Sequence, residues 1–259
     1  RLQSKTWLER FLTVVAGVMF NFIFAIIILF IVGLINGNPN NKPIVSSVIE
    51  DSKAYVAGLK ENDVIVSLNG KKTKNIDRLM IEYQVHYGET LNLEVKRDNE
   101  LLNINIIPDK VDDNYSYGFG LNSDINKGFI EAIKYAFSKF YSLLSQMVII
   151  IGYLFTGKLS LNSLSGPIGI YKVVDESAKA GFLNVIYLIG YLCVNVGFIN
   201  LLPIPAFDGG RILFLIIEKI IGKPVDAKVE NTIHSIGMIL LMILMVVITY
   251  NDIIRFVIK

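Results

Sequence analysis

The sequence predicts a multi-span α-helical membrane protein with one inserted α/β domain of mostly β structure. Hydrophobic residues make up 53% of the 259 residues, and the mean hydropathy of +0.51 is too high for an ordinary soluble protein. Three apolar runs are long enough to cross a bilayer, for which ~20 residues are needed. The polar stretch after the first run alternates apolar and polar residues as β-strands do. Because 25 basic residues are balanced by 23 acidic ones, nucleic acid is excluded as the main partner.

The apolar runs define the candidate membrane spans. Residues 11–34 and 182–202 contain no charged residue. Residues 235–250 form a third, shorter run that residues 253–258 lengthen. The sequence therefore predicts three transmembrane helices.

The charges beside these runs predict an orientation. Residues 1–10 carry a net charge of +2 and residues 209–234 a net charge of +1, whereas residues 36–128 carry −3. Because basic residues near span ends stay on the cytoplasmic side, residues 1–10 and 209–234 are expected there and residues 36–181 outside.

Residues 128–155 are apolar on one side only. Glu131, Lys134 and Lys139 interrupt them at helical spacing. This pattern favours a helix lying in the membrane interface over a fourth span. A Gly-Pro turn is expected at residues 163–170, so that residues 128–180 form an interfacial segment.

Residues 43–121 predict one small soluble domain. Its apolar or alternating segments predict strands, and its Asn-Gly and Asp-Asn pairs predict turns. The expected strands are 44–49, 64–68, 91–95 and 102–107, with a helix at 76–87 and turns at Asn69-Gly70 and Asp98-Asn99.

The segment from Asn200 to Arg211 ends the second span with unusual chemistry. Pro203 and Pro205 stop a helix, and two glycines follow Asp208. A carboxylate at the edge of a bilayer is costly and usually functional. Two interpretations stay open: Asp208 serves a reaction, or it only caps a helix that begins at Arg211.

The pattern N-x-x-P-x-P-x-x-D-G-G resembles the third-ligand motif of the site-2 proteases, which are intramembrane zinc metalloproteases. The resemblance implies that Asp208 is a Zn²⁺ ligand at the cytoplasmic side of the membrane. It also implies that Asn200 holds the substrate backbone or a developing oxyanion, and that Pro203 and Pro205 shape the active-site loop. Phe207 stands where leucine is more usual.

The two zinc-binding histidines of this family come from an H-E-x-x-H helix, which the sequence lacks. The two histidines present, His86 and His234, have no such neighbours. A catalytic zinc normally takes three protein ligands. We therefore expect a fragment that lacks the H-E-x-x-H helix and is inactive by itself; a pseudoprotease is the alternative.

Ala57-Gly58-Leu59 and the residues to Asn69-Gly70 resemble a bacterial PDZ domain of the permuted type. The segment Tyr117 to Leu121 is similar to the loop that binds a peptide's terminal carboxylate in such domains. Gly118, Phe119, Gly120 and Leu121 would then bind a C-terminal peptide; a plain final strand is the alternative.

Two further stretches resemble the same protease family. Residues 16–21 are similar to its A-G-P-x-x-N motif, with Val18 in place of proline, and are interpreted as a close helix contact. Residues 165–169, Ser-Gly-Pro-Ile-Gly, match a stretch before the third span and are interpreted as structural.

The resemblance implies a multi-pass protein of the bacterial inner (cytoplasmic) membrane that cuts single-span membrane proteins in regulated intramembrane proteolysis. Anti-sigma factors and remnant signal peptides are the implied substrate classes. The expected organisation is 1–36, a flank and first span; 43–121, an extracytoplasmic PDZ domain; 128–180, interfacial; and 181–259, two spans around the Asp208 motif. A membrane-anchored PDZ adaptor and a broken-helix transporter are the competing classes.

Overall fold

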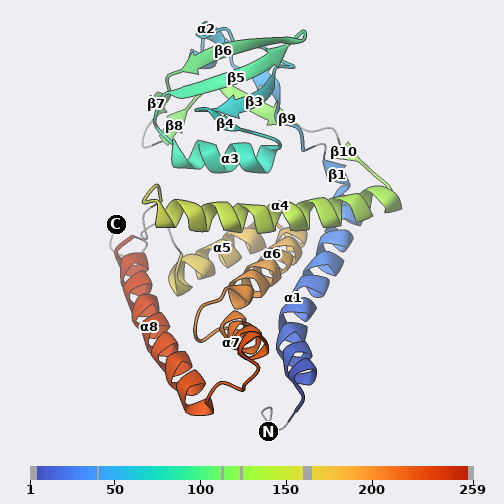
Figure 1. Cartoon of the computed structure of the whole chain (residues 1–259). Helices are drawn as coiled ribbons and strands as arrows, with labels where there is room; N and C mark the ends of the chain where they lie inside the picture. The colour runs from blue at the N-terminus through green and yellow to red at the C-terminus, as the bar shows by residue number, and fades with distance from the viewer. Residues whose placement is uncertain (1–4, 40, 112–113, 123–124, 160–164, 256–259) are drawn as a thin grey trace. The chain divides into compact units, whose positions relative to one another are not determined.

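The computed structural model describes residues 5–39, 41–111, 114–122, 125–159 and 165–255. The chain divides into two compact units (Figure 1). The first unit is helical and consists of Arg1–Ile35 and Ala132–Lys259. The second consists of Asn36–Glu131 and contains the β-structure.

The first unit is built from helices that are numbered along the chain. They are α1 Trp7–Asn36, α4 Phe129–Phe155, α5 Pro167–Lys179, α6 Phe182–Leu201, α7 Asp208–Ile221 and α8 Ala227–Ile253. Within the described residues, α1, α4, α6 and α8 are long and apolar enough to cross a membrane. The three predicted spans are confirmed as helices, and the structure adds α4 as a fourth helix of sufficient length and apolarity.

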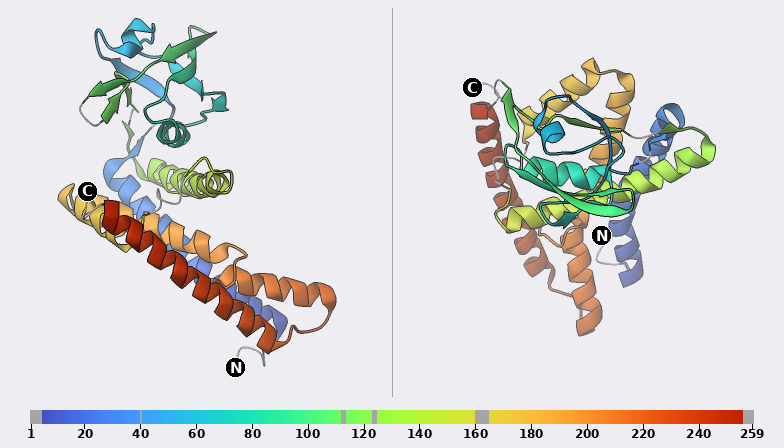
Figure 2. Two further views of the ribbon diagram at one scale, coloured as in Figure 1. Left: turned by 90° about the vertical axis from the view of Figure 1, so that its left-hand side faces the viewer. Right: turned by 90° about the horizontal axis from the view of Figure 1, so that it is seen from above.

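Small residues let the helices of the first unit approach closely. A buried cluster joins Ala25 and Leu29 of α1, Ala136 and Leu143 of α4, and Val194 of α6. The part of α4 that belongs to this unit runs across the ends of α1 and α6 (Figures 1 and 2). Close contacts of this kind commonly hold helices together where water supplies no hydrophobic driving force.

Two glycines of α6 also face α1. A Cβ at Gly190 would lie 2.9 Å from Ile28 Cγ2, and a Cβ at Gly197 would overlap the ring of Phe22. The two glycines are seven residues apart, which places them two turns apart on one face of the helix. The close contact between α1 and α6 therefore depends on the lack of a side chain at these two glycines.

Polar contacts tie distant segments of the first unit together. Arg10 of α1 forms a largely buried ion pair with Glu218 of α7, with Nη2 and Oε2 2.6 Å apart. The Trp7 indole N–H donates to the Leu215 carbonyl at 2.7 Å. Near the C-terminal end of α8, buried Asp252 accepts a hydrogen bond of 2.8 Å from the Gly169 N–H of α5.

Helix α8 lies at the edge of the first unit (Figure 2). It is hydrophobic on all sides, and the large apolar side chains from Ile236 to Val247 are mostly exposed. A helix with this composition and exposure is typical of one that faces lipid.

The second unit contains an antiparallel sheet with the strand order β6-β5-β3-β2-β9 and a short β4 paired to β3. These strands are β2 Ile44–Val48, β3 Val64–Leu68, β4 Lys71–Lys72, β5 Leu91–Arg97, β6 Glu100–Ile106 and β9 Phe119–Asn122. The helices are α2 Lys53–Val56 and α3 Ile76–Val85. Two small antiparallel pairs complete the unit: β1 Asn38–Pro39 with β10 Ile125–Asn126, and β7 Asp109–Val111 with β8 Asn114–Ser116.

Alternation along the strands builds the core of this unit. Leu91, Leu93 and Val95 of β5 are fully buried and pack with Ile65 of β3 and Leu79 of α3. The four predicted strands and the predicted helix are confirmed, with ends that differ by at most two residues.

The two predicted turns are also confirmed. Asp98 and Asn99 have φ of 46° and 73° between β5 and β6. Asn69 and Gly70 have φ of 47° and 74° between β3 and β4. Two consecutive residues with positive φ form the two-residue hairpin turn whose twist matches antiparallel strands.

The Gly-Pro turn predicted for residues 163–170 is wrong from Pro167 onward, where α5 begins; residues 163–164 lie outside the described residues. Proline is well suited to the first position of a helix because its missing N–H has no helical partner there. The Asp252 carboxylate satisfies a second free N–H of this helix start, that of Gly169. Asp252 is 83 residues away in sequence, so local patterns give no sign of it.

A buried ion pair stabilises the second unit. Asp63 is 1% exposed. Its two oxygens accept hydrogen bonds from Arg97 Nε and Nη2, each at 2.7 Å, and Oδ2 also accepts the Lys60 N–H at 2.9 Å. Burial alone would raise the pKa of Asp63, but the Arg97 guanidinium and the Lys60 N–H hold that pKa below its ordinary value.

We predict that Asp63→Asn destabilises the second unit by about 3 kcal/mol at neutral pH, because Arg97 loses its buried partner. A carboxyl group whose pKa is lower in the folded chain stabilises the fold above its unfolded pKa of about 3.9. That contribution disappears as the pH falls through the folded pKa. The protection factors of the β5 amides, which correct for the pH dependence of intrinsic amide exchange, should therefore fall in acid in the wild-type chain and depend less on pH in the variant. The exposed control Glu100→Gln should match wild type; equal protection in Asp63→Asn would contradict the prediction.

Candidate functional site

The candidate site lies in the break between α6 and α7. Helix α6 ends at Leu201, and the linker of residues 202–207 leads to α7. Short hydrogen bonds close this linker on itself: the Ile204 N–H donates to the Leu202 carbonyl at 2.7 Å, and the Phe207 N–H to the Ile204 carbonyl at 3.3 Å. The helix break predicted from Pro203 and Pro205 is thus present.

Gly209 and Gly210 allow the first turn of α7 to pack against the linker backbone. A Cβ at Gly209 would overlap the carbonyl oxygens of Leu201 and Leu202, and a Cβ at Gly210 would lie 2.6 Å from the Ile204 oxygen. Carbonyl oxygens of the backbone cannot swing away as a flexible side chain can. Steric fit therefore explains why both positions are glycine, independently of any reaction.

Asp208 is the first residue of α7 and is half-buried. Phe207 holds the capping position of this helix, and no side chain caps it. The interpretation of Asp208 as the cap of a helix starting at Arg211 is therefore wrong. None of the described residues donates a hydrogen bond to the Asp208 carboxylate or pairs with it.

The Asp208 carboxylate faces α1. A Cβ placed on Gly17 would lie 3.7 Å from Asp208 Oδ2, at van der Waals distance. The glycine of the Ala16–Asn21 stretch thus borders the acid of the Asn200–Arg211 stretch. The sequence interpretation of residues 16–21 as a helix contact did not include this neighbour.

Helix α8 contacts the linker at two consecutive residues. The Ala206 N–H donates to His234 Nδ1 at 2.9 Å. One turn later, a Cβ at Gly237 would lie 2.6 Å from the Pro205 carbonyl oxygen. Sequence reasoning missed His234, and its spacing of three residues from Gly237 in an apolar helix was the available signal.

The other predicted residues of this site lie on the same connection. Asn200 is half-buried in the last turn of α6. Pro203 is exposed and Pro205 half-buried. The structure thus collects all four predicted residues, Asn200, Pro203, Pro205 and Asp208, in and around one linker.

Within the described ranges, no three His, Cys, Asp or Glu side chains gather in a way that could hold a metal ion. His234 uses Nδ1 for the Ala206 N–H. His86 belongs to the other unit, where Nδ1 lies 2.8 Å from Glu89 Oε2. Asp208 therefore stands as a single candidate ligand: an unpartnered carboxylate in an apolar helical unit.

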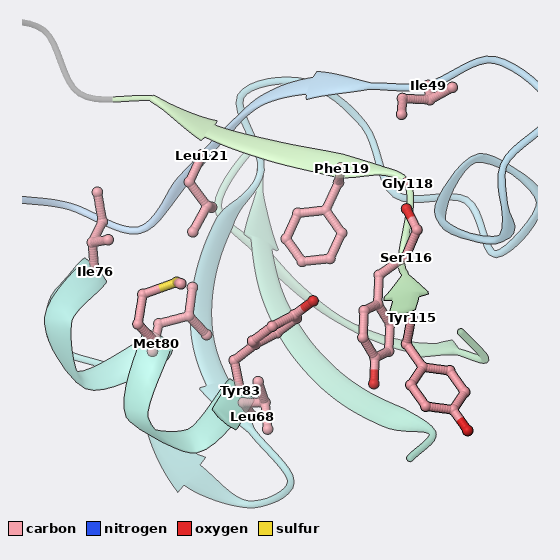
Figure 3. Close-up of a pocket in the computed structure, with 12 residues that line it drawn as sticks. Ile49, Leu68, Ile76, Met80, Tyr83, Tyr115, Ser116, Gly118, Phe119 and Leu121 are labelled. Carbon is pink, nitrogen blue, oxygen red and sulfur yellow. The ribbon is translucent and has the colours of Figure 1, made fainter. Parts of the chain in front are cut away.

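The second unit contains a groove of about 540 Å³ between α3 and β9 (Figure 3). Met80 and Tyr83 of α3 form one wall, and Phe119 and Leu121 of β9 form the other. Strand β9 is the last strand of the sheet path, so its outer edge is unpaired within the described sheet. An open edge beside an apolar groove is the arrangement to which an extended peptide can be added as a strand.

The predicted carboxylate loop is placed in part at this groove. Gly118, Phe119 and Leu121 line it, whereas Gly120 instead approaches Ser47 of β2. Gly118 has φ of 78°, and a Cβ there would overlap Ser52.

Tyrosines close one end of the groove. The rings of Tyr83 and Tyr117 meet edge to face with centroids 5.3 Å apart. The Tyr117 hydroxyl donates to the Glu89 carbonyl at 2.7 Å and accepts the Gly88 N–H at 3.1 Å. Burial raises the pKa of both phenols, so both stay neutral at physiological pH.

Comparison with known proteins identifies a matching family and similar proteins. The family model "Peptidase family M50" matches residues 1–244. The "Regulator of sigma-W protease RasP" of Bacillus subtilis is 38% identical over 255 residues, covering 97% of this chain and 60% of the relative. The proteins called "Zinc metalloprotease RasP" of Bacillus licheniformis and Geobacillus kaustophilus are 37% and 34% identical, with 98% of this chain and 61% of each relative covered. The chain thus spans about 60% of the length of the curated relatives it matches.

We predict that Gly209→Ala lowers the stability of the first unit by about 1–3 kcal/mol, because the added methyl group overlaps backbone oxygens that cannot move aside. Thermal unfolding in detergent measures this change. The matched control is Gly152→Ala in α4, where an added Cβ meets no atom within 4 Å. Equal midpoints for the two variants would contradict the steric role of Gly209.

Proposed function

Because the chain belongs to peptidase family M50, the site-2 protease family, we propose that it is the Asp208-bearing part of an intramembrane zinc metalloprotease. The proposed activity is the cleavage of single-span membrane proteins. The observation that carries the proposal is the half-buried Asp208 carboxylate, which has no partner among the described residues and lies beside Gly17 at a break between two helices.

Asp208 would supply one carboxylate ligand to the zinc ion. A carboxylate is an ordinary zinc ligand, and its lack of another partner leaves its oxygens available. The remaining ligands and the general base are expected on an H-E-x-x-H helix, a sequence that this chain lacks. When bound, zinc would polarise the scissile carbonyl and lower the pKa of its bound water.

The chain's own residues would prepare the substrate. In a transmembrane helix of the substrate, the peptide bonds are protected by the hydrogen bonds of the helix. A locally extended segment of the substrate therefore has to be held in place for cleavage. The amide of Asn200, in the last turn of α6 before the linker, would hydrogen-bond such a segment or a developing oxyanion. The irregular backbone of residues 202–207 fits a cavity lined by protein, where such backbone is tolerated at membrane depth.

The proposed location is the bacterial cytoplasmic membrane. The charge asymmetry supports Asp208 at the cytoplasmic side and residues 43–121 outside. Relatives named for sigma-W regulation and zinc metalloprotease activity support anti-sigma factors, with remnant signal peptides, as the substrate class.

Helix α4 is proposed to lie in the interface and not to cross the bilayer. Its course across the ends of α1 and α6 supports this placement (Figure 1). One of its faces joins the buried cluster, and Phe137, Tyr141 and Val148 are exposed. An amphipathic helix with large apolar side chains on its outer face can insert them between lipid head groups.

The second unit is proposed to be a PDZ domain that binds the C-terminus of a peptide in the groove between α3 and β9. The open edge of β9 and the apolar groove walls support this proposal. The unit would also exclude substrates that still carry a large outer domain. The same groove favours the competing function, a PDZ adaptor without catalysis.

We predict that Asp208→Ala in the complete protein abolishes cleavage of a single-span reporter and lowers the zinc content measured after purification, while the amount of protein stays unchanged. The control is Asp175→Ala, which removes an exposed acid of α5 paired with Lys179. Wild-type cleavage by Asp208→Ala would remove this residue from the active site. A wild-type protein that captured peptides but cleaved no reporter would favour the adaptor.

We predict that Met80→Glu weakens the binding of a peptide with a free, apolar C-terminus by roughly tenfold or more, because it places a charge in an apolar wall. Fluorescence polarisation of a labelled peptide measures the affinity. Met80→Leu, which conserves volume, should bind like wild type. Met80 is 43% exposed, so neither substitution disturbs the core. Equal affinity in all three proteins would exclude this groove as the peptide site.

A further inference from the structure

Ala206 has a backbone conformation that an L-residue rarely adopts. Its φ is 86°, in the region that favours glycine. Such a residue stays in place only when the surrounding structure holds it there, and it is often found at functional sites. Ala206 precedes Asp208 by two residues, so the contacts that hold Ala206 also determine where the Asp208 carboxylate lies.

His234 is the side chain that holds Ala206. Its Nδ1 accepts the Ala206 N–H at 2.9 Å. A ring nitrogen that accepts a hydrogen bond carries no proton, so the neutral tautomer has its proton on Nε2. His234 Nε2 is buried and has no hydrogen-bond partner among the described residues. The imidazole is thus committed to the linker through Nδ1.

Neighbouring elements fix the orientation of this imidazole. Its ring centroid lies 5.9 Å from that of Phe214 in α7. Gly237, one turn further along α8, brings the helix backbone against the Pro205 carbonyl. The linker therefore rests on a rigid helix through two adjacent residues, Pro205 and Ala206.

We propose that His234 is a positioning residue that holds Asp208 in place by accepting the Ala206 N–H. His234 touches neither the substrate nor the metal in this role; it acts through the linker. Its hold on the linker is a property of the structure alone, whereas its effect on catalysis rests on the proposed function.

Two substitutions at one position separate the hydrogen bond from the bulk of the ring. His234→Leu fills the space but accepts no hydrogen bond. His234→Asn places an amide oxygen near the position of Nδ1 and keeps the acceptor. The experiment uses the complete protein in detergent, and the amide exchange of residues 200–212 is followed by mass spectrometry, with peptides short enough to resolve Ala206.

The expected result is faster exchange of the Ala206 amide in His234→Leu, by roughly tenfold to a hundredfold for the loss of one buried hydrogen bond. His234→Asn should restore most of the protection. His86→Leu, at a half-buried histidine of the other unit, should leave the exchange of residues 200–212 unchanged. Unchanged exchange in His234→Leu, or equal loss in the Leu and Asn variants, would overturn the inference.

The same variants test the link to Asp208. His234→Leu should lower kcat for reporter cleavage and increase the rate at which a chelator removes zinc, with little change in KM. Adding Ala206→Gly should restore part of both, because glycine adopts a φ of 86° without strain. A His234→Leu protein with lost amide protection but wild-type kcat and zinc retention would overturn the positioning role.

If neither the wild-type protein nor His234→Leu cleaves the reporter, the proposed function fails. The exchange data still decide whether His234 holds the linker. If His234→Leu does not fold, His234→Asn and Ala206→Gly decide the inference. Wild-type protection of residues 200–212 in His234→Asn then supports it, and loss of that protection with a stable fold overturns it.

Discussion

Irregular backbone inside an apolar helical unit is the constraint on which the arrangement of this protein depends. A break between two helices frees N–H and C=O groups, and these cannot remain unsatisfied where water is scarce. In the α6–α7 linker the N–H groups of Leu202, Ile204 and Phe207 find backbone carbonyls, and that of Ala206 finds His234. Pro203 and Pro205 have no N–H to satisfy. Asp208 can therefore lie at a helix break because each described neighbour either has its partner or lacks the donor.

Absent side chains are the second requirement of the same region. Gly209, Gly210 and Gly237 each approach a backbone carbonyl of the linker, and Gly17 leaves the space that the Asp208 carboxylate faces. Four glycines from three helices thus surround one short segment. An added Cβ would overlap a backbone oxygen at Gly209, Gly210 or Gly237, whereas at Gly17 it would meet the Asp208 carboxylate at van der Waals distance.

Much of the fold follows from local patterns in the sequence. The alternation of Leu91, Leu93 and Val95 identifies a strand, and Asp98-Asn99 identifies its turn, because side-chain periodicity and positive φ are properties of neighbouring residues. The apolar runs locate α1, α6 and α8 for the same reason, and the family resemblance is confirmed by the match to residues 1–244.

The features that local patterns miss involve distant partners. The start of α5 depends on Asp252, and the conformation of Ala206 depends on His234, 28 residues later. The proximity of Gly17 to Asp208 joins residues 191 positions apart in the sequence. Periodicity and turn propensity describe short stretches of chain and carry no information about such pairs.

The hydrogen bond from Gly169 to Asp252 has a mechanical consequence. Helix α8 is one uninterrupted element that grips the start of α5 through Asp252 and the linker through His234. At a rise of 1.5 Å per residue, these two contacts are about 27 Å apart along the helix. A molecule that displaced α5 would have to break the Asp252 hydrogen bond or move α8 together with α5. As long as both hydrogen bonds persist, the positions of α5 and of the linker before Asp208 are thus tied to the same helix.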